Sequence, residues 1–167
     1  MNRIKDKNDN IFKLNDVPGD GNCFFHSVAL SDLVNISNHS DLREHLAETI
    51  SHVASNKNEH KEVIELFELT GGNVKLQSWI DKIKTWADQS SALFIAYIYQ
   101  INVVIISNLE KGFDYFDVKQ WSTMHRQKII PDDCETLYLY HFMFQRPFSP
   151  SKLCNHFGYL KKTQLCK

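Results

Sequence analysis

The sequence predicts an α+β fold in which helices dominate roughly residues 1–100 and strands dominate the rest. Apolar residues recur at helical spacing from Leu42 to Val53, whereas the later run INVVIIS is β-branched almost throughout. The segment TLYLYHFMF alternates between two sets of side chains, as a strand does. This segregation favours a helical half packed on a small, mostly C-terminal sheet, with a tendency towards three α-β-α layers, over regular βαβ alternation.

Five stretches carry helical patterns, and most of them have a recognisable start or end. Asn38 or Ser40 is expected to cap the helix over 42–53, and Asp88 or Ser90 the helix over 92–100. Gly71 and Gly72 are expected to end the helix over 59–69. The fifth is almost wholly apolar, which predicts a central position. The predicted helices are residues 23–34, 42–53, 59–69, 74–86 and 92–100.

Four strands are predicted after the last helix. Residues 101–107 have the length and composition of a buried strand, and residues 113–118 follow as a second one. In 136–144, Leu137, Leu139, His141 and Met143 alternate with Tyr138, Tyr140, Phe142 and Phe144. The prolines in 145–153 predict a loop, and residues 155–160 a short final strand.

The 167 residues predict one domain over 11–162, a frayed polar segment over 1–10 and a short tail over 163–167. A net charge of −1 argues against nucleic-acid binding and against an anionic membrane surface. The chain also has neither an apolar run long enough to span a membrane nor a secretory signal. We therefore expect a monomer in the cytoplasm, or in the host cytoplasm if the protein is a viral or bacterial effector.

One cysteine stands out among four that form no CxxC pair. Cys23 follows the turn-forming residues Gly19–Asn22 and opens an apolar helix. The first turn of a helix presents unpaired N–H groups and about half a positive charge, which stabilise a thiolate. The glycines also allow a substrate carbonyl to come close to the backbone. A buried cysteine of no chemical importance is the ordinary alternative, but the preceding turn indicates an accessible nucleophile.

Three motifs in order resemble the ovarian tumour (OTU) family of cysteine deubiquitinases. DGNCFFHS resembles the family's nucleophile motif, and TWADQSSALFIAYIYQINVVII resembles its block of a Trp, an apolar helix and a buried strand. LCNHFGYL supplies the His followed by an aromatic residue near the end of the domain. The resemblance implies a papain-type fold, a ubiquitin or ubiquitin-like partner and no cofactor. Ala87 and Asp88 stand where the family usually has two glycines.

The resemblance implies roles for the motif residues. Cys23 becomes the nucleophile and His156 its general base and acid, while Trp86 and Phe157 would contact substrate. Asp20 has a catalytic role by its motif position, but physically it is better suited to bracing the loop through Asx-type hydrogen bonds. The candidates for the oxyanion hole are the backbone N–H groups of Gly21 and Cys23 together with Asn22.

The third catalytic residue is left open. Family members often carry Asp or Asn two positions after the histidine, but Gly158 stands there. The orienting group is then Asp16 or Asn15 from upstream, or Asn155 beside the histidine, or the enzyme works as a Cys–His dyad.

Several alternatives stand beside a deubiquitinase that works through a thioester. The missing side chain at Gly158 suits an inactive ubiquitin-binding module, and a viral polyprotein protease would share the fold. A Cys₂His₂ metal site built from Cys23, His26, Cys154 and His156 has spacings that differ from usual zinc patterns, so no metal is expected. The acidic residues Asp132, Asp133 and Glu135 form either a contact for basic residues of ubiquitin or a solvated turn.

Overall fold

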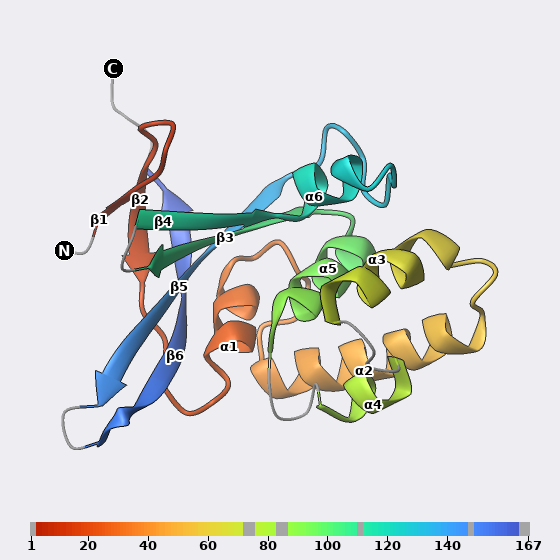
Figure 1. Cartoon of the computed structure of the whole chain (residues 1–167), viewed down its shortest axis with the longest axis horizontal. Helices are drawn as coiled ribbons and strands as arrows, with labels where there is room; N and C mark the ends of the chain where they lie inside the picture. Colours follow the sequence, from red (N-terminus) through yellow and green to blue (C-terminus); the bar gives the residue numbers. More distant parts are fainter. Residues whose placement is uncertain (1–2, 72–75, 83–86, 110–111, 147–148, 164–167) are drawn as a thin grey trace.

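The computed structural model describes residues 3–71, 76–82, 87–109, 112–146 and 149–163. Helices and strands segregate along the chain, which confirms the α+β class (Figure 1). The helices are α1 (Cys23–Leu30), α2 (His39–Ser55), α3 (Lys61–Gly71), α4 (Leu76–Lys82), α5 (Gln89–Tyr99) and α6 (Val118–Met124). The strands are β1 (Arg3–Lys5), β2 (Ile11–Asn15), β3 (Asn102–Leu109), β4 (Gly112–Asp117), β5 (Thr136–Arg146) and β6 (Ser149–Lys162).

The strands form one sheet in the order β1-β2-β6-β5-β3-β4. Only β3 and β5 pair in parallel; the other neighbours are antiparallel. The sheet is curled, and the backbone N–H of Lys7, in the β1–β2 turn, donates to the Tyr115 hydroxyl on β4 over 2.7 Å. The two edges of the sheet thus approach one another.

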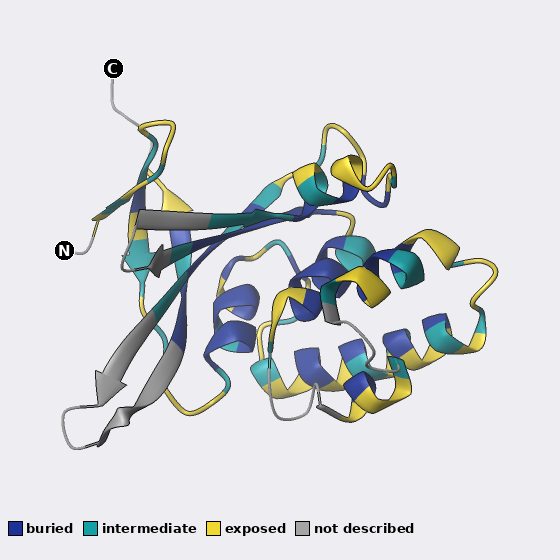
Figure 2. Ribbon diagram, in the orientation of Figure 1, coloured by how far each residue is buried: buried dark blue, intermediate teal, exposed yellow. Residues whose placement is uncertain are grey.

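The helices pack on one face of this sheet. Alternate residues of β3 and β5, such as Val103 and Leu139, join a core built with α1, α2, α3 and α5. Their neighbours Val104 and Tyr140 face the opposite side, where they pack with Phe12 and Leu160. The predicted tendency towards three layers calls for a further layer on this second face. In the structure the sheet curls over that face, so the sheet itself covers the second core. Figure 2 shows the result, with α1 and α5 buried over most of their lengths.

Two of the predicted helix caps are present. The Asn38 side chain accepts hydrogen bonds from the backbone of Ser40 and Asp41 at the start of α2. Asp88 caps α5 in a reciprocal capping box with Ser91. These local hydrogen bonds fix the residues at which α2 and α5 begin.

Two predictions along the chain are wrong. Residues 3–5 were expected to be frayed, but they pair with β2 as strand β1. Most of the loop predicted over 145–153 belongs to the β5–β6 hairpin, where Gln145 pairs with Leu153. Pro150 is tolerated because it lies at the end of the hairpin, where the ladder is already irregular between Gln145 and Arg146.

Candidate active site

The predicted nucleophile begins α1. Cys23 is the first residue of this helix, and the preceding Gly21 has a φ of 86°, in the region that favours glycine. Cys23 is only 8% exposed, and it lines a cavity of about 320 Å³ between the start of α5, the sheet and α1. The thiol is thus held in the wall of a cavity next to the positive end of a helix.

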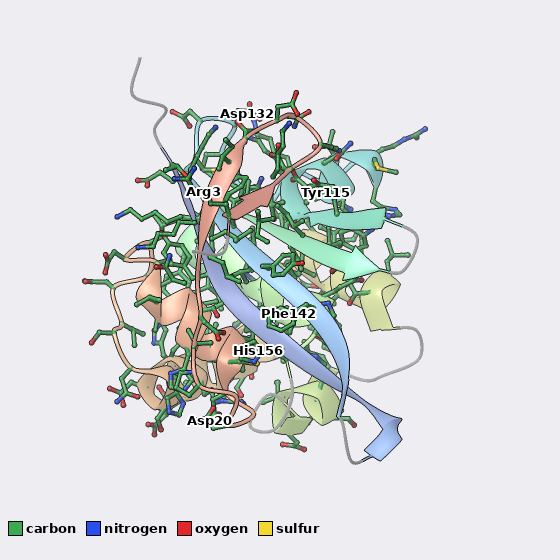
Figure 3. The ribbon with its side chains drawn as sticks, turned by 90° about the vertical axis from the view of Figure 1, so that its left-hand side faces the viewer. Arg3, Asp20, Tyr115, Asp132, Phe142 and His156 are labelled. Carbon is green, nitrogen blue, oxygen red and sulfur yellow. The ribbon has the colours of Figure 1, made fainter. Side chains whose placement is uncertain are left out.

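His156 lies on β6, close to the end of the neighbouring strand β2. Its Nε2 is 2.7 Å from Oδ1 of Asp16, the residue that follows β2. Its ring packs edge-on against Phe142, its partner on β5 (Figure 3). An Nε2–H that donates to the carboxylate leaves Nδ1 with a free lone pair. The Asp16 side chain is 72% exposed, so this contact orients the imidazole more than it stabilises the fold.

The thiol and the histidine meet through the backbone of β6. The N–H of Phe157, the next residue, donates to the Cys23 Sγ over 3.4 Å. The hydrogen bonds of the described residues include none directly between the thiol and the imidazole. Nδ1 of His156 faces the loop that leads into Cys23, because a Cβ on Gly19 would lie 3.8 Å from it. The imidazole lies beside the turn before the nucleophile.

The structure describes the side chains of two of the three predicted orienting residues. Asp16 bonds the His156 ring, whereas the Asn15 side chain donates to the carbonyl of Lys13, and its backbone pairs with Tyr159. The side chain of Asn155 lies outside the described residues, as does Trp86. Asp16 is therefore the candidate that the structure brings into contact with His156.

Asp20 does not contact His156. Its Oδ1 accepts the backbone N–H of Asn22 over 2.9 Å, the Asx-type brace predicted for it, and its Oδ2 is 3.2 Å from Nε2 of His26. These hydrogen bonds, that of Asn22 first, lower the pKa of the Asp20 carboxyl. Because the Asn22 N–H donates to Asp20, the backbone N–H groups of Gly21 and Cys23 are the remaining backbone candidates for the oxyanion hole.

Sequence reasoning missed a second brace on this loop. Arg43, on α2, donates from Nη2 to the carbonyl of Gly21 over 3.3 Å, and its guanidinium lies 4.1 Å from the centre of the Phe25 ring. Burial lowers the pKa of Arg43, and the negative charge of Asp20 opposes that shift. The sequence does show an arginine among the apolar residues of this helix, which indicates a buried role. It does not show which group the arginine would contact.

The remaining predicted residues lie around the cavity or outside the site. Phe157 lines the cavity, stacks on His141 and packs edge-on against Phe24, so it is a wall of the site as well as core. Asp132 is exposed and pairs with Lys128, which fits the solvated turn. His26 points to Asp20, and the side chain of Cys154, another member of the Cys₂His₂ set, lies outside the described residues.

A cysteine at a helix start, beside a histidine that contacts an aspartate at the end of the neighbouring strand, is typical of the site of a thiol-dependent peptidase. A sequence profile described as OTU-like cysteine protease matches residues 18–144, most of the chain. The protein belongs to this family. His156 lies beyond the matched segment, so its assignment depends on the motif and on the geometry described above.

Solved structures support the fold. The viral OTU domain protease from Taggert virus is 18% identical, with a TM-score of 0.59 over 96% of this chain and 84% of that one. The Hazara virus OTU bound to ubiquitin is 18% identical, with a TM-score of 0.54 over 98% and 88%. The OTUD1 OTU domain is 13% identical, with a TM-score of 0.52 over 90% and 85%. No curated protein sequence matches the chain.

Proposed function

We propose that the protein is a deubiquitinase, which hydrolyses the amide bond after the C-terminal glycine of ubiquitin or of a ubiquitin-like modifier. The observation that carries the proposal is the Asp16–His156 contact beside Cys23. Membership of the OTU-like family and the likeness to an OTU solved with ubiquitin supply the substrate class.

The chemistry follows from the two nitrogens of His156. Nδ1 takes the proton of the Cys23 thiol, and the thiolate attacks the carbonyl carbon of the terminal glycine. The imidazolium then gives that proton to the leaving lysine amine, and a thioester remains. Water, activated by the same nitrogen, hydrolyses the thioester and restores the thiol. Asp16 keeps the ring in the tautomer that presents Nδ1, because it accepts the Nε2 proton.

The first step needs the thiol to leave the Phe157 N–H and approach the imidazole. Catalytic hydrogen bonds are often long or misaligned before substrate binds, and tighten in the complex. Rotation of the Cys23 side chain is the smallest movement that brings Sγ towards the side of the loop where Nδ1 lies.

The loop before Cys23 is suited to stabilising the tetrahedral intermediate. The N–H groups of Gly21 and Cys23 are the free donors, and each good donor is worth about 3–4 kcal/mol in the transition state. Asp20 and Arg43 hold the loop from two sides, at the Asn22 N–H and the Gly21 carbonyl. Such donors act best when their positions are fixed beforehand.

The inactive binding module loses its main motivation. That interpretation depended on the missing side chain at Gly158 and on the replacement of the glycine pair by Ala87 and Asp88. Asp16 supplies the contact that position 158 lacks, from the end of β2. The polyprotein protease differs only in substrate, so the experiment below separates it from a deubiquitinase. We further propose that the protein acts as a monomer in the cytoplasm, in a host cell if it is an effector, where modified proteins occur.

Covalent labelling tests the proposal. A ubiquitin probe with an electrophile at its C-terminus should form an adduct with the wild type and none with Cys23→Ala. Cys134→Ala, which removes a partly buried thiol outside the site, should label like the wild type. Labelling with none of a panel of ubiquitin and ubiquitin-like probes, by a folded wild type, would overturn the proposed substrate class.

A further inference from the structure

Three side chains that are able to bind a metal ion lie where the catalytic loop meets α1 and α2. Asp20, His26 and His39 each offer one ligand atom, and these three atoms lie within 4.8 Å of one another. They come from the loop before Cys23, from α1 and from the first residue of α2. Among the described residues, this is the set of His, Cys, Asp and Glu side chains that could share an ion.

Two members of the group are already close to the separation that a metal imposes on its ligands. Oδ2 of Asp20 and Nε2 of His26 are 3.2 Å apart. Bonds of about 2.0–2.2 Å in tetrahedral zinc sites put neighbouring ligand atoms roughly 3.3–3.6 Å apart. His39 must close the remaining gap, and its ring centre is already 4.2 Å from that of His26.

An unsatisfied nitrogen is the independent sign of a missing ligand. Nδ1 of His39 is buried and has no hydrogen-bond partner among the described residues. A buried polar atom normally has a partner in the protein, in ordered water or in an ion. His39 is partly buried, and its ring packs against that of His26.

We propose that Asp20, His26 and His39 form a binding site for a divalent transition-metal ion, with Zn²⁺ as the best fit. Two imidazoles and one carboxylate suit zinc and similar ions better than Ca²⁺ or Mg²⁺, which prefer oxygen ligands. Three protein ligands leave one position for water. Arg43, the cation nearby, is directed to the Gly21 carbonyl and the Phe25 ring, and its charge moderates the affinity.

The site would tie the catalytic loop to two helices. Asp20 would give Oδ2 to the ion and keep Oδ1 on the N–H of Asn22. The ion would thereby connect the turn that carries the oxyanion donors to α1 and α2. This proposal does not depend on the identity of the protease substrate.

Metal binding is measured best on the full chain carrying Cys23→Ala, because the thiol of Cys23 could itself bind added zinc outside the proposed site. In this chain we expect one Zn²⁺ to bind and to raise the melting temperature. Loss of even an outer partner of a metal ligand costs about 10–100-fold in affinity. His39→Ala and His26→Gln should therefore each weaken binding at least about tenfold. His45→Ala, an exposed histidine further along α2, should leave the affinity unchanged.

A spectroscopic measurement tests the same site without the ligand variants. Zn²⁺ added to the Cys23→Ala chain should shift the imidazole NMR signals of His26 and His39 and leave those of His45 and His52 in place. Co²⁺ should give visible bands of nitrogen and oxygen ligation without a thiolate charge-transfer band. Absence of binding, shifts confined to other histidines, or equal affinity in all three histidine variants would overturn the proposal.

Discussion

Leu14 fills the space that a side chain at position 158 would need. A Cβ placed on Gly158 would lie 2.6 Å from Cδ1 of Leu14, closer than such atoms approach in proteins. Two residues further along β2's direction, Asp16 reaches His156 from outside the strand. Position 158 thus has no room for an acidic side chain. The end of β2 supplies both Leu14, which occupies that space, and Asp16, which contacts His156 instead.

Removing the Asp16 carboxylate should slow catalysis while the fold persists. Asp16→Ala leaves Nε2 of His156 without its acceptor, so the ring loses its fixed orientation, and a misplaced catalytic group costs about 10²-fold in rate. Because Asp16 is largely exposed, the free energy of unfolding should change little. Probe-labelling rates and urea unfolding measure the two effects. Equal rates for Asp16→Ala and wild type would remove Asp16 from the mechanism.

The side chain that orients His156 could be moved from position 16 to position 158 by mutation. Gly158→Asn alone should destabilise the protein by about 1–3 kcal/mol, because it overpacks against Leu14. Leu14→Ala should relieve that clash. In the Asp16→Ala background, the pair Leu14→Ala and Gly158→Asn should recover part of the labelling rate, whereas Leu14→Ala alone should not. No recovery by a stably folded triple variant would show that position 158 cannot serve His156 here.

Asp20 should contribute stability that acid removes. Its folded-state pKa lies below the usual 3.8, so the folded chain binds a proton less readily than the unfolded chain. The contribution is therefore present above the unfolded value and is lost as pH falls through the folded one. The stability gap between wild type and Asp20→Ala should shrink on acidification, as measured by urea unfolding from about pH 7 to pH 3.

Asp132→Ala is the matched control for that measurement. The Asp132 pKa is also lowered, chiefly by its hydrogen bond with Lys128, but the residue lies away from the catalytic loop. Only Asp20→Ala should also slow probe labelling at neutral pH. A gap between wild type and Asp20→Ala that stays constant with pH would contradict the proposed brace.

Arg43 should affect both the loop and the rate. Arg43→Lys loses the planar group that covers Phe25 and the reach to the Gly21 carbonyl. We expect a loss of about 1–2 kcal/mol in the free energy of unfolding and slower labelling at temperatures where the variant is fully folded. Glu44→Ala, at the exposed neighbouring position of α2, should change neither. Normal labelling by a destabilised Arg43→Lys would limit the arginine to a structural role.

Local patterns in the sequence were sufficient for the nucleophile but not for its partners. The turn before Cys23, the cap at Asp88 and the alternation in β5 depend on neighbouring residues, and the structure agrees with them. The pairing of β2 with β6 joins Asn15 to Tyr159 across the length of the chain. No local signal specifies that register, so Asp16 remained one candidate among several. Arg43 was missed for the same reason, since its acceptor is 22 positions away.

The order of the three catalytic groups along the chain has a consequence for biosynthesis. The acid and the nucleophile lie only a short loop apart and are synthesised before the imidazole, which lies on β6, a strand that must then insert between β2 and β5. A nascent chain without β6 carries the thiol but not His156. We therefore expect peptidase activity only once β6 has paired with β2 and β5.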